Sequence, residues 1–183
     1  MGQTAKTTHS KRVLATVAII LPRILRRILK GFDGGSTATD LAEISMRDVI
    51  SQVLWIGNAR DAREISRLLN LGVAAVVDLA LEEAPIVFPR DVVYCRFPLV
   101  DGSGNSHTLL KAAVETAATL IRERVPTLVA CSGGMSRSPA VVAAALARVE
   151  QTDPHKELLR VAGTGPHDVS PAFWAELTEA CAD

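Results

Sequence analysis

The chain has 183 residues, with 20 Lys and Arg against 20 Asp and Glu, and this length suits one domain with a single sizeable core. The zero net charge hides an asymmetry along the chain. Residues 1–30 carry seven basic and no acidic side chains. Residues 31–183 carry the other 13 basic and all 20 acidic side chains, a net charge of −7. The main part of the chain therefore lacks the basic footprint of a nucleic-acid-binding protein, and no nucleic-acid partner is expected.

Residues 1–32 combine an apolar run with a basic, amphipathic segment. The run VAIIL and its neighbours, residues 13–21, spans nine apolar or small residues, whereas a helix that crosses a bilayer needs about 20. Arginines follow where a signal peptide would have its cleavage site. Three interpretations stay open: an anchor lying on a membrane surface, a basic targeting presequence, or a helix that packs on the domain. Residues 33–45 are rich in Gly, Ser and Thr and are expected to form a linker.

Residues 46–183 show the pattern of an α/β domain. Strands are expected at residues 49–58, 72–80, 92–99 and 127–131, and helices at residues 61–70, from the N-cap Ser106 to Arg124, from Ser138 to Glu150, at 154–163 and at 170–182. The strand at residues 72–80 is almost continuously apolar, as when both faces of a sheet are covered. The alternation predicts a central, mostly parallel sheet of four to five strands flanked by helices.

The stretch CSGGMSRS, residues 131–138, follows the last strand and leads directly into a helix. Ligands of such sheets bind beyond the carboxyl ends of the strands, where Cys131 lies. The small residues 132–136 allow successive backbone N–H groups to curl around an anion at the start of the helix. The same field favours the thiolate of Cys131, and Arg137 offers a planar fork for two phosphate oxygens. The stretch predicts a thiolate that attacks phosphorus; the alternative is a buried structural cysteine.

This stretch resembles the Cys-x-x-Gly-x-x-Arg-Ser signature of the cysteine-dependent protein phosphatases, and it is most similar to the dual specificity group. LWIGNARDA, FPLVDGSGN and DVSPAFWAEL resemble other segments of those domains. The resemblance implies a protein-tyrosine-phosphatase-like fold. It also implies a phosphocysteine on Cys131, phosphate held by Arg137 and by the loop, Asp101 as the general acid, and Ser138 as the residue that eases departure of the thiolate. The phosphate-binding residues are then Ser132, Gly133, Gly134, Met135, Ser136 and Arg137.

Several alternatives remain. The family usually has a histidine before the cysteine, and Ala130 stands there instead, so a phosphate-binding pseudophosphatase is one alternative. A lipid phosphate phosphatase is another, although the five loop residues carry no charge to meet additional phosphates. An acyl hydrolase pairing Cys131 with His167 or His107 would leave Arg137 without a role. Asp78 competes with Asp101 as the acid.

The expected function is hydrolysis of phosphomonoesters, on phosphoprotein with Tyr or Ser/Thr as the phosphorylated residue. No metal or cofactor is expected, because the cysteines form no CxxC pair and no metal-ligand spacing with the histidines. The cysteine usage fits a reducing compartment, so we expect an intracellular, cytoplasmic protein. Residues 1–32 add a membrane surface as an expected partner.

Overall fold

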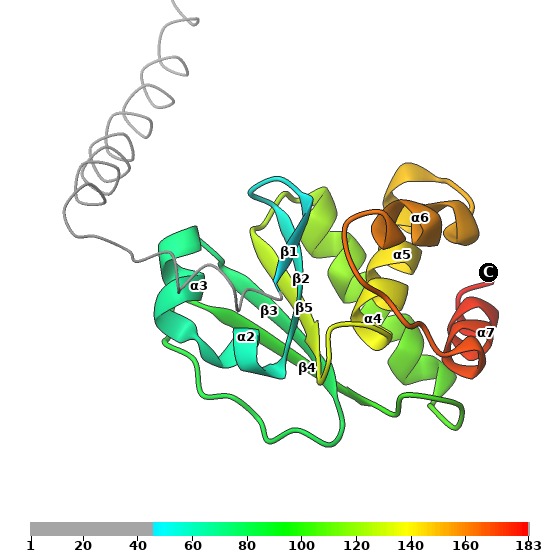
Figure 1. Cartoon of the computed structure of the whole chain (residues 1–183), viewed down its shortest axis with the longest axis horizontal. Helices are drawn as coiled ribbons and strands as arrows, with labels where there is room; N and C mark the ends of the chain where they lie inside the picture. The colour runs from blue at the N-terminus through cyan, green and yellow to red at the C-terminus, as the bar shows by residue number, and fades with distance from the viewer. Residues whose placement is uncertain (1–45, 183) are drawn as a thin grey trace, which may run out of the picture. The chain divides into compact units, whose positions relative to one another are not determined.

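Five strands form one sheet in the part of the chain that the computed structural model describes, residues 46–182 (Figure 1). Their order is β1-β2-β5-β3-β4, with β1 antiparallel to β2 and the other neighbours parallel. The predicted α/β class with a mostly parallel sheet is therefore confirmed. The strands are β1 (Arg47–Ile50), β2 (Leu54–Asn58), β3 (Ala75–Ala80), β4 (Val93–Leu99) and β5 (Thr127–Cys131).

Helices cover both faces of the sheet. In Figure 1, α4 to α7 lie on one side and α2 and α3 on the other. The helices of the described part are α2 (Ala59–Arg63), α3 (Ile65–Leu71), α4 (His107–Arg122), α5 (Arg137–Glu150), α6 (Pro154–Ala162) and α7 (Pro171–Ala180). Ser106 is the N-cap residue of α4, as predicted, although its side chain makes no capping hydrogen bond.

Two expected elements are each divided in two. The segment predicted as one strand, residues 49–58, is a hairpin, because Gln52 adopts a left-handed φ of 59° and Val53 N–H donates to the carbonyl of Ile50 at 3.0 Å. The segment predicted as one helix, residues 61–70, breaks at Glu64, whose ψ of 61° is not helical. A capping box between Asn58 and Asp61 starts the first of the two helices directly after β2.

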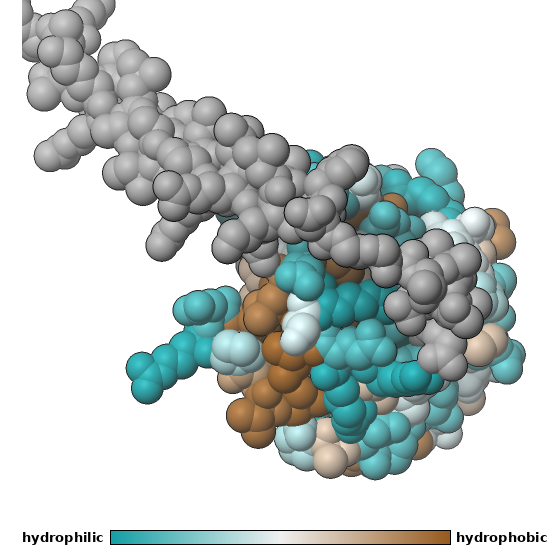
Figure 2. Space-filling model, turned by 60° about the vertical axis from the view of Figure 1, so that its left-hand side comes forward, coloured by the Kyte–Doolittle hydropathy of each residue, from teal (hydrophilic) through white to brown (hydrophobic). Residues whose placement is uncertain are grey.

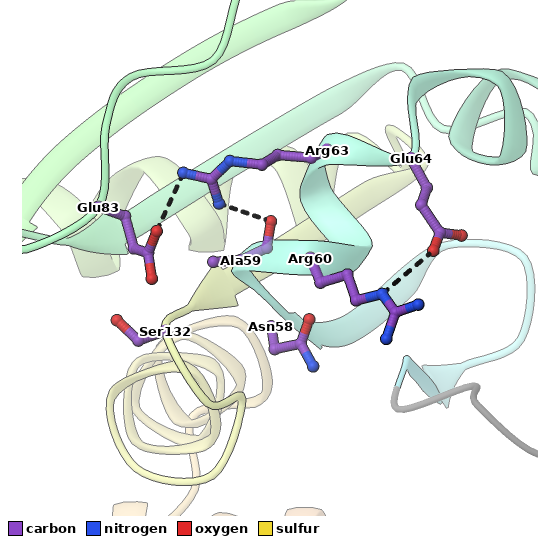
Figure 3. Close-up of a pocket in the computed structure, with 7 residues that line it drawn as sticks. All are labelled: Asn58, Ala59, Arg60, Arg63, Glu64, Glu83 and Ser132. Atoms are coloured by element: carbon purple, nitrogen blue, oxygen red, sulfur yellow. Dashed lines mark hydrogen bonds and ion pairs between the residues drawn. The ribbon is translucent and has the colours of Figure 1, made fainter.

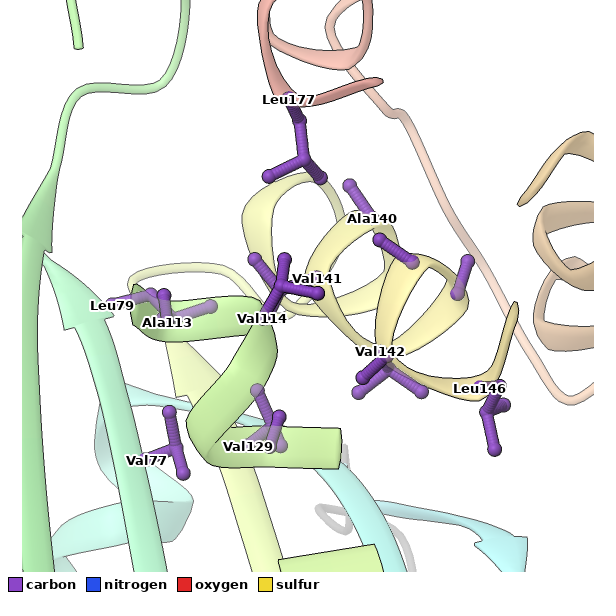
Figure 4. Close-up of a cluster of buried hydrophobic side chains, with 14 of the residues drawn as sticks. Val77, Leu79, Ala113, Val114, Val129, Ala140, Val141, Val142, Leu146 and Leu177 are labelled. Atoms are coloured by element: carbon purple, nitrogen blue, oxygen red, sulfur yellow. The ribbon is translucent and has the colours of Figure 1, made fainter. Parts of the chain in front are cut away.

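The side chains of β5 alternate between two hydrophobic clusters, one on each face of the sheet. Val129 and Cys131 belong to the larger cluster, whereas Leu128 and Ala130 belong to the smaller one with residues of α2 and α3. Figure 4 shows α5 side chains of the larger cluster between those of the sheet, α4 and α7. Cys131 therefore faces the side of the sheet where α5 begins.

The predicted N-terminal segment and linker, residues 1–32 and 33–45, lie outside the described residues, so their roles stay predictions. Figure 2 shows polar side chains over most of the face that it presents, with hydrophobic ones gathered in one part. Val87, between β3 and β4, is the most exposed of the large hydrophobic side chains described, at 89 %. None of the described helices is long and apolar enough to cross a membrane.

Candidate active site

Cys131 ends β5 at the carboxyl edge of the parallel strands. Its side chain is buried, and its Sγ accepts a hydrogen bond from the backbone N–H of Gly134, 3.3 Å away. The next strand toward β1 ends at the same level, since Asn58 is the register partner of Cys131. The sulfur therefore lies under a loop whose backbone folds back over it, as the small residues predicted.

The loop of residues 132–136 is held by contacts from two other segments. Ala59 N–H donates to the carbonyl of Ser132 at 3.2 Å, and Asp168 N–H donates to the carbonyl of Met135 at 2.8 Å. Gly134 adopts a φ of 71°, and a Cβ there would lie 2.9 Å from the carbonyl oxygen of Gly57. This position therefore requires glycine, both for the left-handed backbone and for the close approach to β2.

Arg137 is almost completely buried, and its guanidinium is fixed on three sides. Nη1 donates to the carbonyl of Leu99 and to Glu82 Oε2, each at 2.8 Å. Nη2 donates to Glu82 Oε1 at 2.5 Å and to Ser132 Oγ at 3.2 Å. The two parallel contacts with Glu82 form the bidentate geometry that arginine and carboxylate prefer, so the plane of the guanidinium is determined.

Glu82 is the site residue that the sequence did not reveal. It follows β3 at the same edge of the sheet, and the hydrogen bonds from Arg137 are the main reason why its pKa is lowered to about 2. Ser132 Oγ also donates to this carboxylate. The signal that could have found Glu82 is its place after a buried strand next to β5, where charged residues gather at the carboxyl edge.

Asp101 lies over the same loop, after β4. Its Oδ1 accepts a hydrogen bond from Ser136 Oγ at 2.5 Å, and its Oδ2 lies 3.6 Å from Arg137 Nε. Ser136 Oγ in turn accepts from the backbone N–H of Ser170. The structure thus brings the carboxylate of Asp101 to the loop that holds Cys131, a placement that 30 residues of sequence separation do not reveal by themselves.

The turn that carries Asp101 is tied to α7. Glu176 accepts hydrogen bonds from the backbone N–H groups of Gly104 and Asn105 and from Asn105 Nδ2, at 2.9–3.0 Å. The contact with the Asn105 side chain is the main cause that lowers the pKa of Glu176. Asn105 also bonds to the carbonyls of Val100 and Gly102, on either side of Asp101.

Two buried donors at the start of α5 have no hydrogen-bond partner among the described residues, namely Arg137 Nε and Ser138 Oγ. Buried polar groups are normally hydrogen-bonded, so these two donors are exceptions. Arg137 uses both terminal nitrogens for protein contacts, whereas its Nε makes an ion pair with Asp101 without a hydrogen bond. The arrangement combines a thiol, a carboxylate and two donors without hydrogen bonds around one loop.

Other predicted candidates lie apart from this arrangement. Asp78 is a buried structural residue, because its carboxylate accepts hydrogen bonds from the hydroxyl of Tyr94 at 2.6 Å and from Ala80 N–H at 3.1 Å. Cys131 has no hydrogen bond to any histidine in the described part of the chain.

A polar hollow of about 600 Å³ opens beside the loop (Figure 3). Ser132 borders both the hollow and the guanidinium of Arg137. Arg63 contacts Glu83 across the hollow at 3.0 Å, and Arg60 lies 4.0 Å from Glu64. The lining thus holds two basic and two acidic side chains, and the hollow is polar without a net charge. It is lined by Asn58, Ala59, Arg60, Arg63, Glu64, Glu83 and Ser132.

The sequence matches the family model described as "Polymorphic toxin system, DSP-PTPase phosphatase" over residues 55–151, more than half of the chain. The chain belongs to this family. It is a cysteine-dependent phosphatase of the dual specificity and protein-tyrosine phosphatase type. No curated protein matches its sequence.

Solved phosphatase structures share the fold. A mouse protein assigned to the dual specificity phosphatases and crystallised with zinc tungstate is 27% identical, with a TM-score of 0.67 over 81% of this chain and 92% of that one. Human DUSP28 is 25% identical, with a TM-score of 0.65 over 74% and 95%. The human tyrosine phosphatase-like serine/threonine/tyrosine-interacting protein, at 18% identity and a TM-score of 0.64 over 75% and 95%, shares the fold alone.

Proposed function

We propose that this phosphatase hydrolyses phosphomonoesters through a phosphocysteine intermediate on Cys131. The observation that carries the proposal is the convergence of the buried thiol, the Nε of Arg137 that has no hydrogen-bond partner among the described residues, and the carboxylate of Asp101 on the loop of residues 132–136. Tungstate, bound by the mouse structural neighbour, is a tetrahedral oxyanion of the same shape as phosphate, which supports an anion site in this fold.

In the first step, the thiolate of Cys131 attacks phosphorus, so an S–P bond forms while the P–O bond to the leaving group breaks. Asp101 gives its proton to the departing oxygen. The loop N–H groups and Arg137 stabilise the charge that develops on the phosphoryl oxygens. Ser136, which donates to Asp101, positions the carboxyl over the loop.

In the second step, water attacks phosphorus, Asp101 accepts a proton from that water, and the S–P bond breaks to give inorganic phosphate. The hydroxyl of Ser138 is buried without a partner among the described residues, and a donor of this kind stabilises the departing thiolate. Ser132, Gly133, Gly134, Met135, Ser136 and Arg137 hold the phosphate in both steps. The thiolate, the loop and the arginine perform the roles of a metal ion, so we propose a metal-free reaction.

The proposed substrate is a phosphorylated protein, on Tyr or on Ser/Thr. The loop residues carry no charge that would meet a second phosphate, and the neighbouring hollow has balanced charges, as suits a peptide segment on either side of the phosphorylated residue. A lipid headgroup with several phosphates would find no excess of cations in this hollow.

Turnover of an aryl phosphate tests the proposal. We expect activity in the wild-type chain, loss of activity in Cys131→Ser, no effect of EDTA, and inhibition by vanadate, which mimics the trigonal phosphoryl group. Retained turnover in Cys131→Ser, or loss with EDTA that zinc or magnesium restores, would contradict the mechanism. A chain that binds vanadate but turns over no aryl phosphate would be a phosphate-binding pseudophosphatase.

A further inference from the structure

Arg47 is a cation near the site to which the mechanism gives no role. It is the first residue of β1, and because β1 runs antiparallel to β2, it lies opposite Ile56, near the end of β2 that reaches the register of Cys131. A side chain from the edge strand is thereby delivered to the carboxyl edge of the parallel strands. The sequence offered no sign of this, because residue 47 is remote from every motif.

The side chain of Arg47 is half-buried, and two of its three guanidinium nitrogens are buried without compensation from the described residues. Its Nε and Nη2 are inaccessible to solvent, and neither has a hydrogen-bond partner there. Burial lowers the pKa of this guanidinium, and the negative charge of Cys131 acts in the opposite direction. An unpaired buried cation is destabilising, so its presence needs a reason other than stability.

Gly165 makes room for this side chain. A Cβ at residue 165 would lie 2.7 Å from Cδ and 3.4 Å from Nε of Arg47, so any larger residue would displace the arginine. The φ of Gly165 is not positive, so the backbone itself does not require glycine. The same segment continues to Asp168, whose N–H holds the carbonyl of Met135. Arg47 therefore lies against a segment that also supports the loop over Cys131.

We propose that Arg47 is an electrostatic positioning residue of the site, a second cation that favours the anionic forms of Cys131 and of the phosphoryl group. It acts through its electric field and not through a hydrogen bond to the substrate. The interaction is reciprocal: a thiolate that stabilises the cation is stabilised by it to the same degree. The inference rests on the proposed function, in which Cys131 is the nucleophile.

Other ionisable groups lie on the elements around Cys131, and all of them stay unchanged when Arg47 is substituted. They are Asp61 on α2, Arg137 on α5, Glu82 after β3, Asp101 after β4, and His167 and Asp168 before α7. Arg137 already has its charge compensated by Glu82 and Asp101, whereas the described residues provide no carboxylate contact for Arg47. Within residues 46–182, the charge of Arg47 is therefore not cancelled by a carboxylate at short range.

The test compares full-length Arg47→Gln, Arg47→Lys and Arg47→Met with the wild-type chain. The rate of alkylation of Cys131 by iodoacetamide is measured against pH, together with the acidic limb of kcat/KM for an aryl phosphate. In Arg47→Gln and Arg47→Met the midpoint of alkylation should rise by about half a pH unit, as expected for a unit charge at moderate distance. Activity below the midpoint should fall about threefold, and Arg47→Lys should restore most of both.

Thermal unfolding separates this role from packing. Arg47→Met should raise the unfolding temperature by a few degrees, roughly 2–4 °C in a domain of this size, because a cation whose buried nitrogens have no partner is removed. A packing role predicts the opposite sign. Arg148→Gln serves as the control for loss of a partly buried arginine, since Arg148 contacts Glu115 and the carbonyl of Cys181 at the other end of α5. It should leave the alkylation midpoint unchanged.

Gly165→Ala gives a second approach that leaves the charge in the chain. It should move Arg47 and shift the midpoint in the same direction, whereas Gly163→Ala, which would contact just the carbonyls of Arg160 and Leu159, should not. An unchanged midpoint in folded Arg47→Gln, or an equal shift in Arg47→Lys, overturns the inference. If Cys131→Ser still turns over the aryl phosphate, the proposed function fails instead, and the two failures are distinguishable.

Discussion

At the scale of single residues, the guanidinium of Arg137 is the best-defined group of the site. Its terminal nitrogens are bound to Glu82, Leu99 and Ser132, and Nε points toward Asp101. An arginine that is free in solution would lose side-chain entropy on binding phosphate, whereas this one is already ordered. In the proposed mechanism, Glu82 therefore pre-organises Arg137, because it fixes the guanidinium before the substrate binds.

Glu82→Gln should reduce kcat/KM for an aryl phosphate by about 10–100-fold and weaken inhibition by vanadate, because the guanidinium is no longer held in one plane. Glu83→Gln is the matched control, since the neighbouring carboxylate contacts Arg63 in the hollow and not Arg137. Equal effects of the two substitutions would show that general acidity of this segment, and not the bond to Arg137, matters.

The acid dependence of stability should also change in Glu82→Gln. Arg137 holds the pKa of Glu82 at about 2, against an ordinary value of 4.5, so this pair stabilises the fold fully above about pH 4.5. The contribution is lost as the pH falls from 4.5 toward 2. In urea unfolding at fixed pH, the difference in stability between wild type and Glu82→Gln should therefore shrink over this window and stay constant above it. A difference that does not shrink between pH 4.5 and 2 would contradict the shift.

The substitution Asp101→Asn tests the proposed acid, because the rate that is lost should depend on the leaving group. Protonation of the leaving oxygen contributes typically 10²–10⁴-fold, and a poor leaving group such as an alkyl alcohol needs it most. The variant should therefore slow alkyl phosphates far more than nitrophenyl phosphate, while substrate binding survives. Asp78→Asn is the control: it loses contacts with Tyr94 and Ala80, so it should lower stability and leave the leaving-group dependence unchanged. Equal slowing of both substrates in Asp101→Asn would mean that this residue just shapes its turn.

Local sequence could predict those residues of the site that are contiguous. Cys131, the loop and Arg137 lie within one strand-to-helix turn, so their proximity follows from the chain itself. Asp101 came from resemblance to a family. The place of Glu82 after a buried strand was a signal, but neither its contact with Arg137 nor the position of Arg47 could be predicted. Each depends on which strands are neighbours, and the order β1-β2-β5-β3-β4 is not written in any one segment. Nothing in the sequence distinguishes Glu82 from the adjacent Glu83, yet Glu82 contacts Arg137 and Glu83 contacts Arg63.

At the scale of elements, α7 controls a turn that is far away in sequence. Glu176 binds the turn that carries Asp101 through three hydrogen bonds, two of them to backbone N–H groups. The short helix is therefore part of the support for the proposed acid, Asp101. Its bonds hold the turn in one form in spite of two glycines, Gly102 and Gly104, at positive φ.

Glu176→Ala should lower kcat on a poor leaving group by about tenfold with little change for nitrophenyl phosphate, because the turn no longer holds Asp101 in place. Glu179→Ala, on the same helix, is the control and should change neither rate. Since hydrogen bonds from Asn105 and its neighbours lower the pKa of Glu176, this support is present above the ordinary carboxyl range and is lost as the pH falls through the lowered value. Similar losses for good and poor leaving groups would argue against a role specific to the acid.

Helices and strands could be predicted where the hydrophobic pattern continues over many residues. They could not be predicted where a single residue interrupts the element. The hydrophobic run before Gly57 predicts one strand, yet Ser51 and Gln52 form a tight turn and make it a hairpin. The turn depends on a non-glycine residue at positive φ, for which sequence gives no signal. This hairpin has a consequence for the site, because it places Arg47 beside β2.

At the scale of the whole molecule, the charge of the chain is divided between its two parts. Residues 1–30 carry seven positive charges, and the remainder carries a balance of −7. All the groups of the proposed mechanism lie within the described residues, which begin at Met46. Catalysis and location are thus expected to reside in different parts of the chain, as the division at residues 33–45 predicts.

A shortened chain that starts at Ser45 should therefore keep its activity on an aryl phosphate, because it retains Arg47, the sheet and the whole loop. The full chain should bind vesicles that contain phosphatidylserine, and the shortened chain should not, since seven cations and an apolar face supply the attraction. The binding should weaken with salt, because salt screens the charges.

A full-length variant with Arg23, Arg26 and Arg27 changed to glutamine separates the contribution of charge from that of apolar contact. It should lose most vesicle binding at low salt and none of the phosphatase activity. If the full chain does not bind such vesicles at low salt, the prediction of a membrane anchor is wrong. A helix that packs on the domain then becomes the preferred interpretation of residues 1–32. If instead the shortened chain loses activity, residues 1–44 belong to the catalytic domain and the predicted boundary is wrong.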